Sequence, residues 1–215
     1  MTAGVLLLHG HGRTGLSMSF LASELADAGF ASIAPSYGMR RSMDEILAHL
    51  APRIATFEAT LDGPLHIVTH SLGGLVARAL VNSSRPKRLG RMVQLAPPNQ
   101  GSELADMLFD MKLSAAVLGP VAPMLRTNRL RSHEALFGPV DYELGIVAGD
   151  VSVNLVPESI LPRPNDGKVS VAATRLPGMA DHVVVHVPHS LMPFHPDSVG
   201  QALAFLDGGR FRHQG

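Results

Sequence analysis

A glycine-rich loop near the N-terminus offers the first chemistry to test. The residues from Gly10 to Gly15, GHGRTG, match the G-x-G-x-x-G spacing that lets a backbone approach a dinucleotide pyrophosphate. That chemistry also needs an Asp or Glu about 20 residues further on, at the end of the second strand, to bind the ribose hydroxyls. The sequence there reads APSY, and Asp27 and Asp44 lie before and after the required place. The loop therefore does not indicate a nucleotide site.

A serine at the end of an apolar run is the second candidate. In the stretch LHIVTHSLGGLVARAL, residues 65–80, a buried type of strand turns into a helical pattern around Ser71. A serine on so sharp a turn must adopt a strained backbone that lifts its hydroxyl above the sheet, and small neighbours such as Gly73 and Gly74 avoid clashes. Because a serine hydroxyl is weakly nucleophilic at neutral pH, it would need a base, and the base would need an orienting acid.

This segment resembles the nucleophile elbow of the α/β-hydrolase superfamily. The residues THSLG, 69–73, stand where the family usually has Gly-x-Ser-x-Gly, with Thr69 in place of the first glycine. The stretch LAPPNQGSELAD, residues 95–106, resembles the loop after the next strand in bacterial lipases and esterases. The resemblance runs from Val5 to about Phe205 and implies a member of the bacterial lipase/esterase branch.

The resemblance also implies the partners of Ser71. The family order of serine, acid and histidine points to Asp166, in an Asn-Asp-Gly turn, and to His189, just beyond an apolar strand. Asp150 is the alternative acid, and Asn-Asp-Gly is in any case a good turn sequence. The competing histidines lie in or beside the last strand or after a loop that contains proline; they are His182, His186 and His195.

The glycine-rich loop acquires a different role from the same resemblance. The residues HGHG, 9–12, resemble the lipase loop that supplies a backbone N–H to the oxyanion of acyl transfer. The implied oxyanion donors are the amides of His11 and Leu72, so the backbone direction at His11 matters more than its side chain. We expect the His9 ring to hold the loop by hydrogen bonds, and His70 to pack or hydrogen-bond beneath the serine.

The elements that must position these residues alternate along the chain. Apolar, strand-like runs alternate with helical patterns, which is typical of βαβ units and a parallel sheet. The expected strands are Val5–His9, Ala31–Ala34, Leu65–Thr69, Met92–Ala96, Leu144–Ala148 and Val183–Val187. The clearest helix starts at Ser42, which forms a capping box with Glu45. We predict an α/β-hydrolase fold: a compact, mainly parallel sheet of about six strands flanked by helices on both faces.

The chain length and composition favour one domain over residues 1–215. A chain of 215 residues, 46% hydrophobic and 17% charged, can bury a sizeable core. Residues 102–140 are apolar but irregular, and we expect them to form a small cap or site-covering segment. Six of its residues could line an acyl cleft, although their helical spacing favours helix core. They are Met107, Leu108, Phe109, Met111, Leu113 and Val117.

Charge and composition exclude several classes of partner. Lys plus Arg (18) balances Asp plus Glu (18), so no overall field attracts nucleic acid. The absence of cysteine excludes thiolate chemistry, and the histidines show no metal-binding spacing, so we expect no metal and no cofactor. We expect no integral membrane segment, a candidate lipid-interface contact and, for lack of a signal peptide, a cytoplasmic location.

The sequence thus predicts a serine-dependent carboxylic ester hydrolase, of the esterase or lipase type, that acts on a small-molecule ester or acyl substrate through an acyl-enzyme on Ser71 and serves lipid metabolism. Two alternatives stay open. One is an acyltransferase or thioesterase with the same three residues, and the other is a non-catalytic binding protein with a hydrolase fold.

Overall fold

The computed structural model describes residues 2–38, 40–152 and 156–213. In this part of the chain six strands form one parallel sheet in the order β2-β1-β3-β4-β5-β6. The strands are β1 (Gly4–Leu8), β2 (Ala31–Ile33), β3 (Leu65–His70), β4 (Leu89–Leu95), β5 (Leu144–Gly149) and β6 (Asp181–Val185). The predicted mainly parallel α/β sheet is therefore confirmed.

Each expected strand is present, with ends that differ by up to a few residues. The largest consequence concerns the last strand, which ends at Val185 rather than Val187. Its register explains the difference, because β6 pairs with β5 from Gly145 opposite Asp181 to Gly149 opposite Val185, and β5 ends there. His186 therefore follows the strand directly instead of lying inside it.

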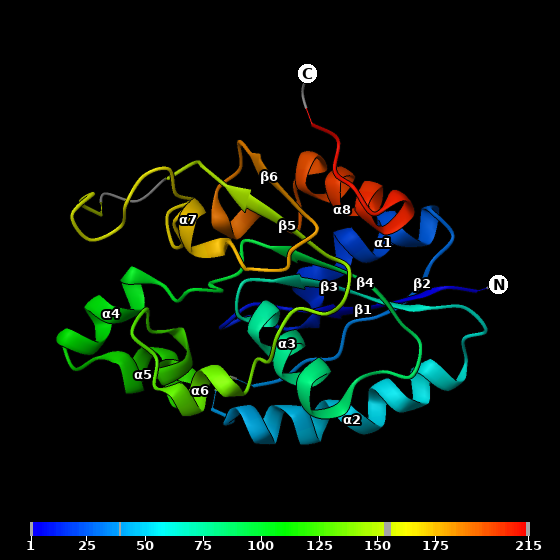
Figure 1. Ribbon diagram of the computed structural model, residues 1–215, viewed down its shortest axis with the longest axis horizontal. Coiled ribbons are helices and arrows are strands. Elements are labelled where there is room, and N and C mark those ends of the chain that lie inside the picture. Colours follow the sequence, from blue (N-terminus) through cyan, green and yellow to red (C-terminus); the bar gives the residue numbers. More distant parts are fainter. Residues whose placement is uncertain (1, 39, 153–155, 214–215) are drawn as a thin grey trace.

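Helices cover both faces of the sheet (Figure 1). Along β1, Val5 and Leu7 belong to the core beneath α1 (Ser19–Asp27) and α8 (Pro196–Gly208), whereas Leu6 and Leu8 belong to the core beneath α2 (Met43–Ala59) and α3 (Leu72–Ser84). This is the alternation that a strand buried on both faces must show. The two hydrophobic cores hold the sheet rigid, and its carboxyl-terminal edge can therefore carry fixed side chains.

The start of α2 follows the predicted capping box. The Ser42 hydroxyl accepts a hydrogen bond from the Glu45 amide at 3.3 Å, and the Glu45 carboxylate accepts one from the Ser42 amide at 2.7 Å. These bonds satisfy two amides that the first turn would otherwise leave open. Pro52 lies inside the helix, which nevertheless continues to Ala59.

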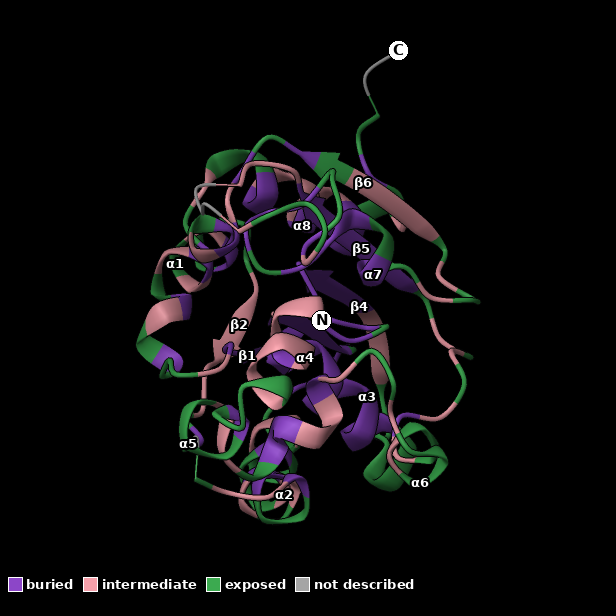
Figure 2. Cartoon of the chain, turned by 90° about the vertical axis from the view of Figure 1, so that its left-hand side faces the viewer, coloured by how far each residue is buried: buried purple, intermediate pink, exposed green. Residues whose placement is uncertain are grey.

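Residues 102–140 form a set of short helices at the carboxyl-terminal end of the strands. They are α4 (Glu103–Asp110), α5 (Ser114–Leu118), the 3-10 helix η2 (Gly119–Leu125) and α6 (Arg131–Ala135). Figure 2 shows that α6 is mostly exposed, whereas α3 behind this segment is buried almost throughout. Ala105, Val121, Leu125 and Phe137 attach the segment to the core around α2 and α3.

The remaining short elements belong to the connections. They are η1 (Gly15–Met18), α7 (Val171–Thr174) and η3 (His189–Leu191). Among the described helices, none combines the length and the apolar character that crossing a bilayer requires.

Candidate functional site

Ser71 occupies the sharp turn between β3 and α3. Its backbone has φ 54° and ψ −124°, a strained region for a residue with a side chain. The turn is held because the Ser71 amide donates to the Leu95 carbonyl at 2.9 Å and the Ser71 carbonyl accepts from Gly74 at 2.9 Å. Gly73 is required for close packing, since a Cβ there would lie 2.3 Å from the Leu8 carbonyl oxygen. Thr69 is fully buried, and its hydroxyl has no hydrogen-bond partner within the described chain.

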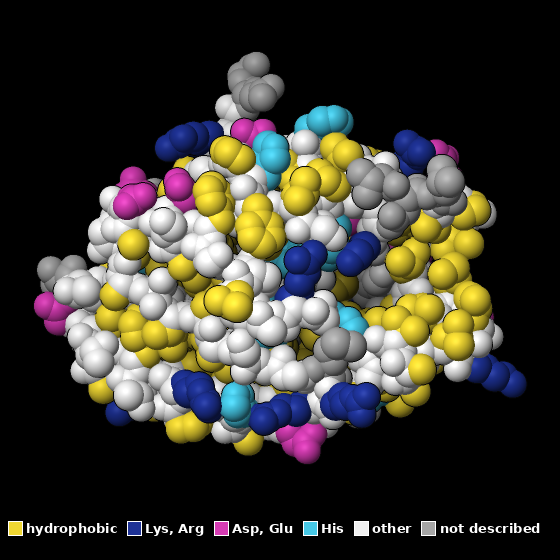
Figure 3. All heavy atoms as spheres, turned by 180° about the vertical axis from the view of Figure 1, so that it is seen from behind, with side chains coloured by type: hydrophobic (Ala, Val, Ile, Leu, Met, Phe, Trp, Pro, Cys, Tyr) yellow, Lys and Arg dark blue, Asp and Glu magenta, His cyan; other side chains and the backbone are white. Residues whose placement is uncertain are grey.

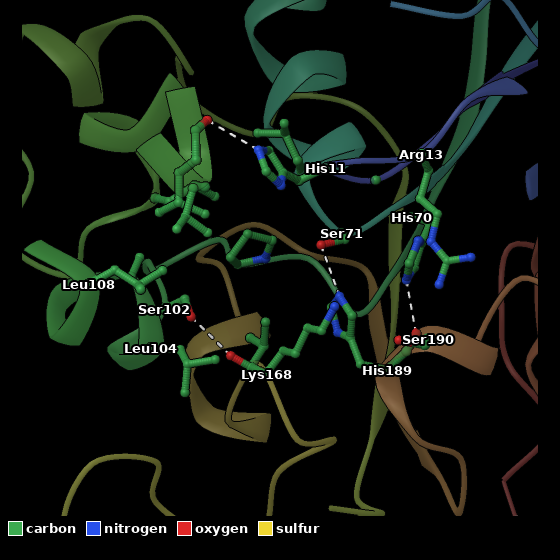
Figure 4. Close-up of a pocket in the computed structure, with 18 residues that line it drawn as sticks. His11, Arg13, His70, Ser71, Ser102, Leu104, Leu108, Lys168, His189 and Ser190 are labelled. Carbon is green, nitrogen blue, oxygen red and sulfur yellow. Dashed lines mark hydrogen bonds between the residues drawn. The ribbon is translucent and has the colours of Figure 1, made fainter. Parts of the chain in front are cut away.

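The structure brings Ser71, His189 and Asp166 together in one hydrogen-bonded chain. His189 Nε2 lies 3.0 Å from Ser71 Oγ (Figure 4). His189 Nδ1 lies 2.7 Å from Asp166 Oδ2. Because a carboxylate only accepts, Nδ1 carries the proton and Nε2 is free to accept the Ser71 proton. The side chains of His189 and Asp166 are 5% and 1% exposed, so water does not compete for these bonds.

The loop after β5 fixes Asp166 through its backbone as well as its side chain. Asp166 Oδ1 accepts from the amides of Lys168 at 2.9 Å and Val169 at 2.8 Å, which is the local turn bonding that the sequence suggested. Its other oxygen remains for His189. The Asp166 carbonyl in addition accepts from the His189 amide at 2.9 Å. The loops that hold the carboxylate and the imidazole are thus joined directly.

The alternative acid, Asp150, and the three competing histidines lie outside the pocket that contains Ser71. Asp150, after β5, pairs with His186 at 2.9 Å, and the His186 side chain is 85% exposed. His182 contacts the Thr174 hydroxyl at 3.0 Å, and His195 Nδ1 accepts from the first turn of α8. None of these three histidines lines the pocket that contains Ser71.

His11 and Leu72, the expected oxyanion donors, both line the pocket beside Ser71. Within the described chain neither amide donates to a protein acceptor. Gly10 allows the loop that contains His11 to approach Ser71 closely, since a Cβ at Gly10 would lie 3.1 Å from Ser71 Cβ. The His11 ring donates from Nε2 to the Leu118 carbonyl at 3.1 Å, and burial lowers the pKa of His11. That ring therefore ties the loop to residues 102–140.

His70 lies beneath the elbow. Its Nε2 donates to the His189 carbonyl at 3.0 Å, and the two ring centroids are 4.9 Å apart. Burial holds the pKa of His70 well below its ordinary value, so the ring is neutral. Since Nε2 carries the proton, the buried Nδ1 is an acceptor, and it has no partner within the described chain. His70 thus positions the backbone of His189.

His9 has the structural placement expected for it. Its Nδ1 donates to the Gly10 carbonyl at 2.9 Å, and its Nε2 accepts from the Tyr37 amide at 3.1 Å. The His9 ring also stacks on Tyr37 with centroids 3.9 Å apart. Burial lowers the pKa of His9.

A pocket of about 250 Å³ opens above Ser71. Its apolar wall comes from residues 102–140 and consists of Leu104, Ala105, Leu108, Val117, Leu118 and Leu125. Of the six apolar residues singled out in the sequence, Leu108 and Val117 line this wall, whereas Met111 and Leu113 are 56% and 43% exposed. The segment therefore supplies the apolar wall of the pocket, and its helices do not bury all of their apolar side chains.

Besides Ser102, the N-cap of α4, sequence reasoning missed three polar pocket residues. Arg13, Lys168 and Ser190 line the same pocket as Ser71. Each of them adjoins a predicted site residue, since Arg13 follows the oxyanion loop, Lys168 follows the acid and Ser190 follows the base. That adjacency is the signal that could have found them.

The described residues contain no group of three or more His, Cys, Asp or Glu side chains placed to hold a metal ion.

A cluster of basic residues at 85–91 forms contacts within the fold. Arg85 pairs with Asp141, Arg91 pairs with Glu143 at 3.1 Å, and Arg88 donates to the Leu61 carbonyl at 2.6 Å.

Comparisons with known proteins agree on the fold. The lipase BlEst2 of Bacillus licheniformis in its mature form is 18% identical, with a TM-score of 0.75 over 94% of this chain and 88% of that chain. Its propeptide form is 16% identical, with a TM-score of 0.82 over 100% of this chain and 52% of that chain. Phospholipase PlaB from Legionella pneumophila is 16% identical, with a TM-score of 0.67 over 98% of this chain and 60% of that chain. No curated protein matches in sequence.

Sequence comparison with family models assigns nearly the whole chain. Residues 5–211 match the model of the alpha/beta hydrolase family, which includes the elbow, the loop of Asp166 and the loop of His189. The chain therefore belongs to the alpha/beta hydrolase family.

Proposed function

We propose that this protein is a serine-dependent carboxylic ester hydrolase that acts through an acyl-enzyme on Ser71. The observation that carries the proposal is the buried hydrogen-bonded chain from Asp166 through His189 to the strained Ser71. A base that is held in the correct tautomer, and that contacts a raised hydroxyl, is the arrangement that activates a serine.

The proposed reaction has two halves. His189 Nε2 takes the Ser71 proton while Oγ attacks the ester carbonyl carbon, and the amides of His11 and Leu72 bind the oxyanion. The intermediate then collapses, the bond to the alcohol oxygen breaks, and His189 returns the proton to that oxygen. In the second half His189 deprotonates water, which attacks the acyl carbon. His189 then returns this proton to Ser71 Oγ as the bond between Oγ and the acyl carbon breaks, and the acid leaves. Asp166 stabilises the imidazolium in both halves.

The pocket supports a short or medium apolar acyl group. Its volume of about 250 Å³ lies below the roughly 300–1,000 Å³ that is usual for ligand sites. The leucines of residues 102–140 supply an apolar wall beside Ser71. Val117 in this wall is 45% exposed, and Leu191, which follows the pocket residue Ser190 in the chain, is 50% exposed. They support contact with a lipid-like substrate.

A fluorophosphonate probe followed by intact-mass measurement tests the nucleophile. We expect one adduct on the wild-type protein and none on Ser71→Ala. Ser83→Ala is the matched control, because Ser83 lies on α3 away from the pocket and its hydroxyl donates to Ala79 of its own helix. An adduct that persists in Ser71→Ala would overturn the assignment of Ser71 as the nucleophile, and the absence of any adduct on the wild-type protein would favour a non-catalytic binding protein.

A second measurement separates hydrolysis from acyl transfer. We expect 4-nitrophenyl butyrate to give free butyrate, with no change of product when alcohols or thiols are added as acceptors. Transfer of the butyryl group to an added acceptor in preference to water would identify an acyltransferase, and selective cleavage of the matched thioester would identify a thioesterase.

A further inference from the structure

The pocket carries a local positive charge that the ester chemistry does not use. Arg13 and Lys168 line it, both are exposed, and neither forms an ion pair within the described chain. No Asp or Glu lines the pocket, and Asp166 lies behind His189. Since the whole chain has a formal net charge of zero, this charge is a property of the site and not of the surface at large.

Neighbouring groups leave these two cations uncompensated. Burial is the main cause that lowers the pKa values of His11 and His70. The positive charge of Lys168 lowers both pKa values further, and that of Arg13 also lowers the pKa of His70. Two acids of α4, the helix whose Leu104, Ala105 and Leu108 line the pocket, have other partners: Glu103 Oε1 accepts from the Ser170 hydroxyl at 2.9 Å, and Asp106 pairs with Arg126 at 3.3 Å. Figure 3 shows basic and histidine side chains beside a hollow in one face of the molecule, with hydrophobic side chains next to it.

Arg13 lies on the side of Ser71 away from the apolar wall, whereas Lys168 lies between that wall and His189 (Figure 4). In Figure 4, Leu104 and Leu108 are on one side of the serine, and Arg13 and Ser190 are on the other. Lys168 follows Asp166 by two residues, and its side chain extends toward His189. In the proposed reaction His189 returns the proton to the departing alcohol. Lys168 adjoins the place of the alcohol because its side chain extends toward His189, and Arg13 adjoins it from the side away from the leucines, which adjoin the place of the acyl chain (Figure 4).

We propose that the site selects esters whose alcohol portion carries an anionic group, a carboxylate or a phosphate, held by Arg13 and Lys168. This inference rests on the proposed ester hydrolysis, since it uses the direction in which His189 releases the alcohol. The guanidinium of Arg13 offers paired N–H donors and Lys168 offers a mobile point charge, which together suit a tetrahedral or planar anion.

A matched pair of esters tests the selection. In 4-carboxyphenyl butyrate the alcohol side is anionic, and in 4-carbamoylphenyl butyrate it is neutral with nearly the same shape. Binding is measured by calorimetry on Ser71→Ala, which cannot form the acyl-enzyme, and kcat/KM is measured on the wild-type protein. We expect the anionic ester to bind about tenfold more tightly, as two partly exposed charge contacts allow, and the preference to shrink in about 0.5 M NaCl.

Charge-removing variants assign the effect to residues. In the Ser71→Ala background we expect Arg13→Gln and Lys168→Gln each to reduce the preference about threefold and the double variant to abolish it. Lys87→Gln is the control, because Lys87 is an exposed cation remote from this pocket. It should leave the preference unchanged.

The two proposals fail in different ways. Equal binding of the two esters, or a preference that survives loss of both cations, overturns the inference even if both esters are cleaved. A preference that disappears with the cations supports it. Failure of the wild-type protein to cleave either ester overturns the proposed hydrolysis, and binding to Ser71→Ala then reports on the anion site alone.

Discussion

Two aspartate–histidine pairs lie in the loops after β5 and β6, and they differ far more in surroundings than in length. Asp166 and His189 are 2.7 Å apart, with side chains 1% and 5% exposed. Asp150 and His186 are 2.9 Å apart, with side chains 34% and 85% exposed. Only the buried pair continues to a serine, at 3.0 Å from His189 Nε2.

The comparison shows that a short distance between an aspartate and a histidine does not by itself fix their geometry, whereas burial does. Water can replace either partner of the exposed pair, so its geometry is held weakly and it contributes little to stability. The buried pair has no such competitor, and the amides of Lys168 and Val169 fix its carboxylate from the far side. The same two residue types therefore form a buried pair bonded to a serine in one place and a surface contact in the other.

The largest contrast is expected in catalysis. Asp166→Asn should lower kcat for a nitrophenyl ester by about 10⁴, because an amide no longer selects the productive His189 tautomer or stabilises its charged form. Asp150→Asn is the matched control and should stay within about twofold of the wild-type protein, since substitutions away from special contacts are usually near neutral. Equal losses in the two variants would end the distinction between the pairs.

The pairs should also differ in stability. Asp166→Ala leaves the buried amide of Val169 and the part-buried amide of Lys168 without their acceptor, and should lower the free energy of unfolding by about 2 kcal/mol. Asp150→Ala should change it by less than about 0.5 kcal/mol. Urea titration monitored by circular dichroism measures both values. A larger loss in Asp150→Ala than in Asp166→Ala would contradict this account.

A smaller effect concerns the pH dependence of folding. Burial lowers the pKa of His70 in the folded protein, so below the ordinary value of about 6.5 the unfolded chain binds a proton that the folded chain does not. Stability should therefore be lost as the pH falls below about 6.5, by at most about 1.4 kcal/mol per pH unit for this group. Urea midpoints at pH 7.5 and 5 measure the loss.

The variant His70→Gln should flatten that dependence while keeping a donor for the His189 carbonyl. His186→Gln, in the exposed pair, is its control and should retain the wild-type slope. If His70→Gln kept the full slope, the buried ring would not be the source.

The smallest expected effect tests whether the exposed pair can substitute for the buried one. Adding Asp150→Asn to Asp166→Asn should change the residual kcat by less than about twofold, because Asp150 bonds His186 and does not reach His189. Steady-state assays at matched folded fraction provide the comparison. A further tenfold loss in the double variant would show that Asp150 supports the residual activity.

Much of the framework could be predicted from the sequence, because strands buried on both faces read as continuous apolar runs. The elbow was recognisable because residues 69–73, between such a run and a helical pattern, resemble the Gly-x-Ser-x-Gly turn of the α/β-hydrolases. The boundaries were less certain, and β6 ends at Val185 because pairing with β5, not local propensity, sets its length.

Contacts between distant residues could not be predicted in the same way. Arg13 and Lys168 meet at one pocket only because the sheet brings the loops after β1 and β5 to the same edge. Residues 102–140 were equally hard to resolve, since helices as short as α5 and α6 have little intrinsic stability and take their form from what they pack against. Their apolar residues therefore divide between the pocket, the core and the surface.

The main-chain hydrogen bond from the His189 amide to the Asp166 carbonyl has a consequence for how the loops around the pocket can fluctuate. Any fluctuation that preserves this link displaces acid and base in concert, so their spacing is insulated from the motion. Widening of the entrance then falls to the opposite rim, where the His11 ring is fastened to Leu118 by one side-chain hydrogen bond. The loops of Asp166 and His189 thus keep their spacing, while the contact between His11 and Leu118 on the other side of the cavity controls its width.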